Sequence, residues 1–438
     1  MQRESDIGPL DSRMRLRKEF CRGLDENSGN VKKLSPDGVS FGNSLTAPAT
    51  IMDFGFNQEQ ELLRDSARTF LATECPMTLV RQLMEEEQGY APELWRKMAS
   101  LGWTGMLIPE EDGGLGLSFV EMALLLEEMG RVTLPGPFFS TAVCAASLLS
   151  EPDTGPAARS LLPGIASGET RATIAWMESS GQLDPEAIQA SWRPVADGIE
   201  LEGVKVFVPD AIGADWILVA ARAAETAGPD GIDLFLVPAG AEGLSLTPLQ
   251  TLDQTRKQAE VRLAGVRVGA SDRIGPAGSG WPRLERMAER ARAALAAESC
   301  GGAARVLEMS VDYAKVREQF GKPIGSFQAI QHKCADMMVK VESGRSAAWY
   351  AAWAIASGAP EAHLASAMAK AYCSDAFREV AGEGIQIHGG IGFTWEHDMH
   401  IYFKRAKSSE VAFGDGVWNR ERVARVILPE AGSGDFDE

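Results

Sequence analysis

Two stretches in the last third of the chain carry side chains that could do chemistry. Glu298 stands in the otherwise apolar run ALAAESCGG, where a carboxylate is costly unless another group pairs with it. It could have the raised pKa of a general base, or it could be satisfied by a core hydrogen bond or by reaching the helix flank. Arg317 and Phe320 belong to the corner VREQFGKPIG between two expected helices. That corner suits an anionic ligand, or it is a plain helix connection with an exposed arginine.

Patterns of apolar residues place both stretches in the last of three parts. From residue 57 to about 163, apolar residues recur at helical spacing, and Ser118 with Glu121 has the pattern of a capping box. From about 169 to 275, short β-branched runs split by Gly, Asp and Pro predict a small antiparallel sandwich or barrel. From about 280, long helical patterns with short connections predict an antiparallel four-helix bundle. The sequence therefore predicts an α+β protein with a helical domain at 52–168, a β-domain at 169–276 and a helical bundle at 277–429.

The two ends of the chain differ from this pattern. Residues 1–51 are polar, mix charges of both signs and lack the apolar centre of a signal peptide. We expect them to be disordered or to be an upstream extension. Residues 430–438 are expected to form an acidic tail.

Composition excludes several classes of partner. A net charge of -18 argues against nucleic acid as the main partner. No apolar run reaches the length of a membrane span. The six cysteines are scattered and form no CxxC motif, which predicts a reducing, cytoplasmic location. The histidines of WEHDMH lack a third ligand in the sequence, so no metal site is expected.

Three motifs, together with the order of the parts, resemble the acyl-CoA dehydrogenase family. They are the corner at 317–331, QIHGGIGFTWEHD at 386–398 and IPEEDGGLGLS at 108–118. The resemblance covers about residues 52–428. It implies non-covalent FAD and a tetramer of this chain with itself or with a homologous subunit. It also implies α,β-dehydrogenation of an acyl-CoA, as in fatty acid β-oxidation, with branched or ring-bearing acyl groups among the candidates and an electron-transfer flavoprotein or similar acceptor.

The resemblance also assigns the FAD contacts. Arg317 and Phe320 would meet the pyrophosphate and the adenine across a subunit interface. Gln386, Gly389 and Gly390 would offer hydrogen-bonding groups, including backbone N–H groups, to the same part of the cofactor. In the β-domain, Phe207 replaces the tryptophan of the family's Trp-Ile-Thr element and could pack on the flavin. The family's Thr-Glu-Pro-Gly-x-Gly-Ser-Asp pattern is replaced by AWMESSGQLD, so the flavin environment should differ.

The catalytic base is the open question of this resemblance. The family places a glutamate at one of two positions, which are Phe413 and Ala291 in this chain. Glu298 is the first replacement candidate, because it lies two helical turns, about 10 Å, beyond Ala291 on the same helix face. Asp415 is the second candidate, two residues from Phe413.

Two further charged residues carry expectations of their own. Glu410 is expected to pair with Lys404 or Lys407 on its own helix. Arg292 is a candidate for contact with the CoA part of the substrate, or else for an interhelical ion pair.

Three alternatives to a complete dehydrogenase stay open. A partner subunit without its own chemistry would complete the flavin site of a second chain. A flavin monooxygenase on the same fold would also lack the glutamate, since it needs an oxygen adduct of the flavin and not a proton-abstracting carboxylate. A scaffold without flavin is the third alternative.

Overall fold

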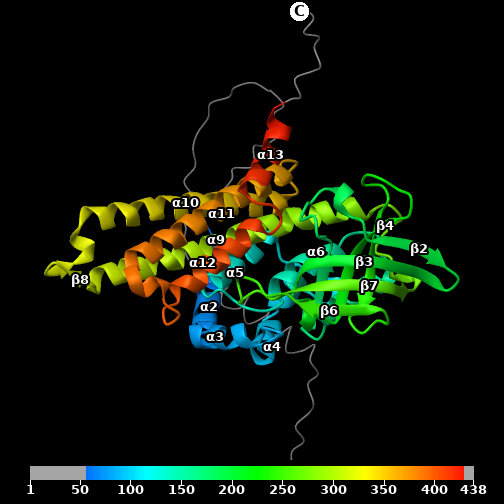
Figure 1. Cartoon of the computed structure of the whole chain (residues 1–438), viewed down its shortest axis with the longest axis horizontal. Helices are drawn as coiled ribbons and strands as arrows, with labels where there is room; N and C mark the ends of the chain where they lie inside the picture. Colours follow the sequence, from blue (N-terminus) through cyan, green and yellow to red (C-terminus); the bar gives the residue numbers. More distant parts are fainter. Residues whose placement is uncertain (1–55, 429–438) are drawn as a thin grey trace, which may run out of the picture. The chain divides into compact units, whose positions relative to one another are not determined.

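The structure is a computed structural model, and it describes residues 56–428. The expectations for residues 1–51 and for the acidic tail at 430–438 lie outside the described residues. Helices come first, a β-sheet follows, and long helices return after it (Figure 1). This order confirms the predicted α+β fold class, while the domain boundaries at 168 and 276 stay predictions.

The helices before the sheet begin where local sequence signals predict. Ser118 caps α5, because its Oγ accepts the N–H of Val120 at 3.1 Å while the Glu121 carboxylate accepts the N–H of Ser118 at 3.1 Å. The predicted capping box is therefore confirmed. The helices of this part are α2 (Gln58–Glu74), α3 (Met77–Glu85), α4 (Pro92–Ser100), α5 (Phe119–Arg131), the π-helix η3 (Phe139–Ala145), α6 (Ala146–Leu149), α7 (Pro156–Arg159) and α8 (Leu162–Ser167).

The middle part of the described chain is a seven-stranded sheet. The pairings β1–β4 and β2–β4 are parallel and the others antiparallel, so the predicted wholly antiparallel arrangement is wrong in this detail. A crossover is possible because the β2–β3 hairpin supplies the chain length between β1 and β4. The strands are β1 (Ala172–Ala175), β2 (Ser191–Val195), β3 (Gly198–Pro209), β4 (Trp216–Ala223), β5 (Ile232–Pro238), β6 (Leu244–Pro248) and β7 (Gln258–Val268).

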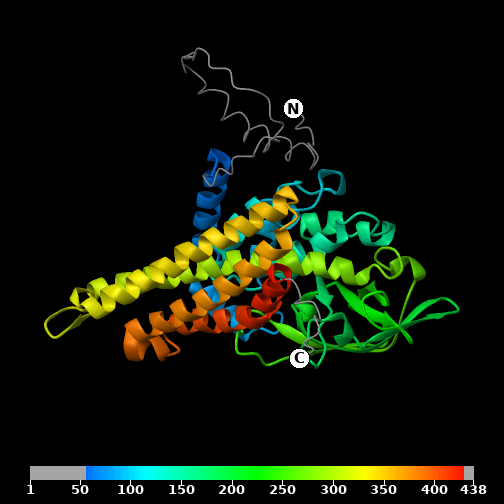
Figure 2. The ribbon, with the colours of Figure 1, turned by 90° about the horizontal axis from the view of Figure 1, so that it is seen from above.

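The long helices after the sheet form the predicted bundle. Four of them run side by side, with short connections that reverse the chain (Figures 1 and 2). The turn between α9 and α10 contains the two-residue strands β8 (Glu318–Gln319) and β9 (Lys322–Pro323), and it lies at the end of the bundle away from the sheet (Figure 1). The helices are α9 (Gly280–Val316), α10 (Gln328–Ser357), α11 (Ala362–His388), α12 (Met399–Val411) and the final α13 (Gly416–Ile427).

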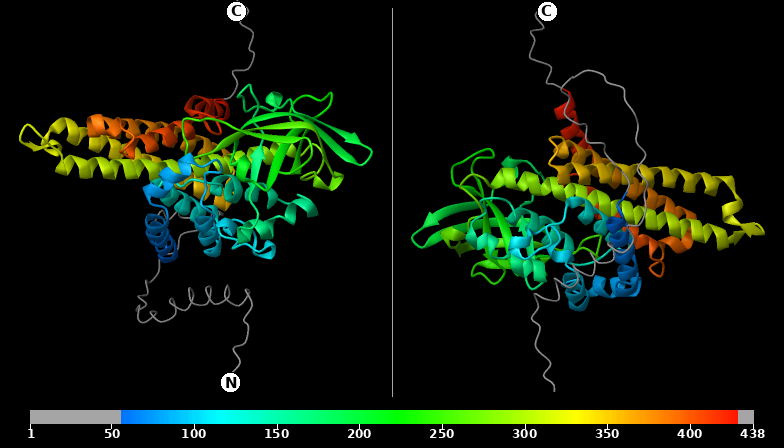
Figure 3. Two further views of the ribbon diagram at one scale, coloured as in Figure 1. Left: turned by 60° about the horizontal axis from the view of Figure 1, so that its bottom comes forward. Right: turned by 180° about the vertical axis from the view of Figure 1, so that it is seen from behind.

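Helix α5 joins the first part to the bundle by crossing α9 at very short range, an arrangement seen from two further sides in Figure 3. A Cβ on Gly130 would lie 2.0 Å from the carbonyl oxygen of Glu298, and one on Gly301 would lie 1.7 Å from that of Glu127. Such distances exclude any side chain, so glycine is required on both helices. The crossing brings the backbone of α5 against the position of Glu298.

A buried ionic network surrounds Glu298 at this crossing. Its two carboxylate oxygens accept from Arg256 at 2.6 Å and from Arg405 of α12 at 2.5 Å. Arg405 also donates to Asp253 at 2.9 Å and to the carbonyl oxygen of Leu134 at 3.1 Å. The Arg405 and Asp253 side chains are 2% and 1% exposed. Two guanidiniums thus face two carboxylates, and the network links the first helices, the β6–β7 connection and the bundle.

We expect substitution of Glu298 by glutamine to destabilise the fold. The change leaves Arg256 and Arg405 buried with an incomplete set of partners, and breaking a buried pair on one side typically costs about 3–5 kcal/mol. Urea unfolding at neutral pH, followed by tryptophan fluorescence, measures this loss. Glu421→Gln, which removes one partner of an exposed pair with Arg425, is the matched control and should leave the midpoint unchanged. Equal midpoints for the two variants would show that the network does not hold the parts together.

Candidate active site at the junction of sheet and bundle

The loop between α12 and α13 carries the first of the two usual base positions. Phe413 is buried there in the left-handed region, with φ of 56°. The carbonyl oxygen of Gly414 accepts from Lys370 Nζ and from Asn419 Nδ2, both at 2.9 Å. Lys370 also donates to the carbonyl oxygen of Glu410 at 3.0 Å, and burial lowers its pKa to about 7. The bonds from Lys370 and Asn419 therefore hold the α12–α13 loop, and with it Phe413, in place.

Phe413 belongs to an aromatic cluster drawn from all three parts. Its ring stacks on Trp176, which follows β1, at a centroid distance of 5.8 Å and an interplanar angle of 28°. The edge of Phe139 from η3 meets Phe413 at 5.9 Å. The guanidinium of Arg256 lies 5.1 Å from the centroid of the Phe139 ring, so the cluster rests directly on the ionic network.

Strand β3, which pairs with β2 and β7, carries Phe207 near its end. Its side chain is 51% exposed, and its φ is 53° at the point where the β3–β7 register shifts. The preceding N–H of Val206 donates to the carbonyl oxygen of Met177 at 2.9 Å, which places Phe207 beside the loop that begins at Trp176. Glu178 of that loop is held by buried Lys205 at 2.7 Å. Phe207 can therefore offer an exposed ring face next to the cluster, and its flavin contact stays a prediction.

Neither predicted base stands free in the part of the chain that the structure describes. Burial alone would raise the pKa of Glu298, but Arg256 and Arg405 offset this and hold it below its usual value. The expected raised pKa is therefore wrong, because sequence alone does not show the two guanidiniums. Asp415 is exposed, and its carboxylate caps α13 by accepting the N–H of Trp418 at 2.8 Å. Ion-paired or solvated carboxylates with these roles are weak bases at neutral pH.

The other two charged candidates, Glu410 and Arg292, are also in contact with neighbouring side chains. Glu410 pairs with Lys407 at 2.5 Å, which confirms one of the two expected partners, and with Arg378 at 3.0 Å. Arg292 is 3% exposed and lies 5.8 Å over the ring of Trp418, and its Nε has no hydrogen-bond partner among the described residues. Burial lowers its pKa to about 10. Its predicted contact with CoA stays a prediction.

The predicted FAD corners lie together at the far end of the bundle. Tyr313, one helical turn before Arg317, stacks on His388 at 4.5 Å, and this contact brings the corner beside Gly389 and Gly390. Phe320 is 92% exposed with φ of 55°. Within residues 56–428, Arg317 has no ion-pair partner. Gln386 is exposed on the same stretch of α11.

The two halves of the predicted FAD site are far apart within one chain. Arg292 at the junction and the end of α9 at Val316 are separated by 24 residues of continuous helix, or about 36 Å. An extended FAD molecule does not span that length. The corner and the junction of one chain therefore cannot hold the same cofactor.

Several residues of the site have no direct signal in the sequence, among them Trp176, Arg256 and Lys370. Arg405 could have been found, because Ile401, Tyr402, Arg405 and Ala406 share the buried face of α12 at helical spacing. An arginine on such a face needs a buried partner. This signal points to a network but does not identify its other members.

Metal-ligating side chains do not gather in the described part of the chain. Residues 56–428 contain no group of three or more His, Cys, Asp and Glu side chains placed to hold a metal ion. Within the same range, every helix is too short or too polar to cross a membrane.

Three family models match consecutive parts of the chain. The N-terminal domain of acyl-CoA dehydrogenase matches residues 57–169, the middle domain residues 173–266 and the C-terminal domain residues 278–428. Together they cover most of the chain in the order observed in the structure.

Individual relatives agree with these matches. Acyl-CoA dehydrogenase IpdE2 of Mycolicibacterium smegmatis is 34% identical over 371 residues, which is 84% of this chain and 98% of that protein. A variant of the Tcur3481-Tcur3483 steroid ACAD has a TM-score of 0.75 at 33% identity, covering 84% of this chain and 98% of its own. The ChsE4-ChsE5 complex from Mycobacterium tuberculosis has a TM-score of 0.76 at 29% identity, with 85% and 98% covered. The chain therefore belongs to the acyl-CoA dehydrogenase family, whose reaction is the FAD-dependent α,β-dehydrogenation of acyl-CoA thioesters.

Proposed function

We propose that the chain binds FAD and an acyl-CoA within an assembly of at least two subunits and takes part there in acyl-CoA dehydrogenation. The separation of about 36 Å along α9 carries this proposal, because the corner at Arg317 and the junction at Phe413 must then serve cofactors in different chains. A tetramer of this chain with itself or with a homologous subunit meets that requirement.

The residues at the far end of the bundle fit the adenine and pyrophosphate of FAD. A Cβ placed on Gly321, Gly389 or Gly390 would meet nothing within 4 Å, so the space beside these glycines is open to a ligand. Arg317 can donate charge-assisted hydrogen bonds to a pyrophosphate. Phe320 can cover an adenine face, and its 92% exposure would fall on binding.

The residues at the junction fit a flavin ring and an acyl thioester. When bound, FAD supplies the acceptor for the β-hydride. Trp176 and Phe413 exclude water from this place, and Phe207 provides an apolar face on the sheet side. Arg292, with its Nε unpartnered among the described residues, can donate to an anionic or carbonyl group of CoA.

The aromatic cluster favours a bulky acyl group with a ring. Phe413 and Phe139 are buried, so the ring faces open to a ligand are those of half-buried Trp176 and exposed Phe207, and stacking on such faces adds stability beyond simple burial. The steroid dehydrogenase among the structural neighbours supports this choice. Electrons would leave through an electron-transfer flavoprotein or a similar acceptor. The five cysteines within residues 56–428 form no disulfide, which supports a cytoplasmic location for the protein.

A second candidate function is favoured by the missing base. Phe413 and Ala291 occupy both usual positions, and Glu298 is ion-paired on both oxygens. In this second function, the chain completes the FAD site of a homologous subunit that carries its own glutamate. The two-component name of the ChsE4-ChsE5 neighbour supports such an arrangement.

The FAD proposal predicts that Arg317→Gln lowers cofactor content. Loss of a charge-assisted bond to pyrophosphate should weaken binding roughly ten-fold or more. The ratio of flavin to protein absorbance after gel filtration, for the chain expressed with its natural companions, measures the change. Lys315→Gln, two residues earlier and also exposed, is the control and should retain FAD. Equal FAD content in both variants would remove Arg317 from the site.

The missing base predicts a gain of function. Phe413→Glu places a carboxylate at the usual base position, and a positioned base contributes about 100-fold or more to the rate. The measurement is bleaching of bound flavin by a panel of acyl-CoAs under nitrogen, using the chain without a homologous partner. Phe413→Gln controls for the change of shape and should not gain activity. Wild-type bleaching as fast as that of Phe413→Glu would show that the chain already has a base and would exclude the second candidate.

A further inference from the structure

A pocket lies where the ends of α2 and α5 meet α9 and α12. Its volume is about 310 Å³, at the lower end of the range of small-molecule sites. Arg68, Arg131 and Arg305 line it together with apolar side chains that include Leu71, Met77 and Val132.

The pocket is separate from both parts of the FAD site. Arg305 follows Ala291 by 14 residues on α9 and precedes Val316, the last residue of that helix, by 11, distances of roughly 21 Å and 16 Å along the axis. A ligand in this pocket would therefore not touch the junction or the corner at Arg317.

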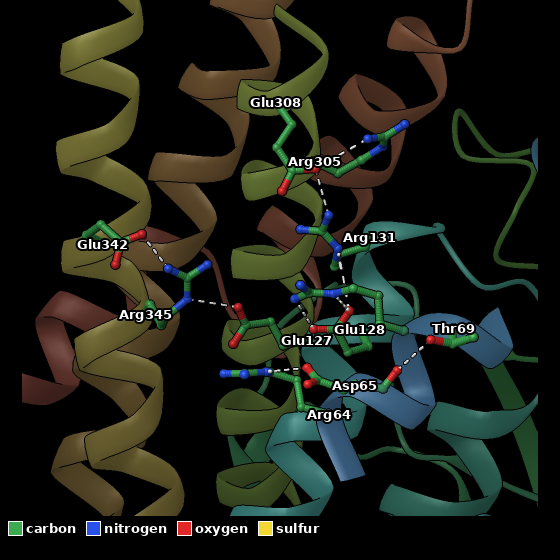
Figure 4. A network of polar contacts seen from close by, with 11 residues as sticks. Arg64, Asp65, Thr69, Glu127, Glu128, Arg131, Arg305, Glu308, Glu342 and Arg345 are labelled. Atoms are coloured by element: carbon green, nitrogen blue, oxygen red, sulfur yellow. Dashed lines mark hydrogen bonds and ion pairs between the residues drawn. The ribbon is translucent and has the colours of Figure 1, made fainter. Parts of the chain in front are cut away.

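The three arginines of the pocket share two carboxylates within residues 56–428. Arg68 holds buried Glu128 with two bonds of 2.9 and 2.7 Å. Arg131 lies between Glu128 and Glu308, with its Nη2 2.6 Å from Glu308, and Arg305 reaches the same carboxylate at 3.3 Å (Figure 4). Asp65 and Glu127 lie close to Arg68 and Arg131, so the charges around the pocket balance, and the arginines offer a ligand free N–H donors and not net charge.

Part of the guanidinium of Arg68 and of Arg305 remains available to a ligand, whereas the Arg131 side chain is only 14% exposed. The side chains of Arg68 and Arg305 are 49% and 43% exposed, whereas the side chain of Glu128 is 1% exposed and lies behind them. A guanidinium has five N–H donors, and the bonds above use only some of them. A planar carboxylate is a fitting acceptor for the free donors.

The rest of the wall is apolar. Leu71 and Ala72 belong to the last turns of α2, Met77 begins α3, and Val132 follows the end of α5. Arg68, Leu71, Ala72 and Cys75 share one face of α2 at spacings of three and four residues. Helix α2 thus contributes to both the charged rim and the apolar floor, while Arg131 and Arg305 of the rim come from α5 and α9.

We propose that this pocket binds a small monocarboxylate with a compact apolar body. The half-exposed guanidiniums of Arg68 and Arg305 match one carboxylate, and the apolar floor matches a short hydrocarbon. The proposal does not depend on FAD or acyl-CoA binding elsewhere in the chain.

Isothermal titration of the full chain with sodium octanoate tests the proposal. We expect one saturable site per chain, weakened about ten-fold or more by Arg305→Gln, which removes a charge, and by Ala72→Phe, which fills the pocket. Arg96→Gln, an exposed arginine on α4 outside the pocket, is the control and should bind as the wild type does. Binding should also weaken at high salt.

Other outcomes would overturn the proposal. If octanol binds as tightly as octanoate, charge plays no part in binding. If inorganic phosphate binds as tightly as octanoate, the apolar floor plays no part. Octanoate affinity unchanged by Ala72→Phe would place the ligand elsewhere, including the junction. If Arg305→Gln does not fold, Ala72→Phe decides alone, because its added ring leaves every charge in place. If the titration shows no saturable binding of octanoate, the proposal is wrong.

Discussion

The buried contact of Glu298 with Arg256 and Arg405 is the constraint on which the rest of the structure depends. It lies where α5 crosses α9 closely enough that only glycine fits at Gly130 and Gly301. Burying four charged groups is costly, and such networks are weak evidence for added stability. Their value here is geometric, because the fork of Arg405 fixes α12 against the β6–β7 connection and against the chain that follows α5.

This constraint also determines which chemistry the junction can do. A carboxylate bonded to two guanidiniums has a lowered pKa and little tendency to take a proton from a weakly acidic carbon. Above the network, Lys370 and Asn419 fix the loop that presents Phe413, so an aromatic ring and not a carboxylate faces Trp176. The unbroken length of α9 then separates this junction from the exposed corner at Arg317. Both features are the basis for proposing an assembly of more than one chain.

Much of the fold follows from local patterns, whereas the site depends on contacts that local patterns do not specify. Ser118 with Glu121 and the long helical periodicities predict helix starts and the bundle. Helical spacing also shows that Glu298 lies on an apolar face, but it does not show which cation meets it, since Arg256 and Arg405 come from other parts of the chain. The parallel pairings of β4 are missed for the same reason, because strand patterns give the faces of a strand and not its neighbours. Likewise, the stacking of Trp176 on Phe413 joins residues that are far apart in the sequence.

The central claim is that Glu298 is a structural partner of two arginines and not a base. Exchange of the α-protons of an acyl-CoA in D2O, followed by NMR with the FAD-loaded chain and no homologous subunit, tests it most directly, because exchange requires proton abstraction but no hydride transfer. The account predicts that the α-proton signal decays no faster than in buffer containing free FAD. Saturable exchange catalysed by this chain alone would contradict it and would return a carboxylate of the junction to the role of base.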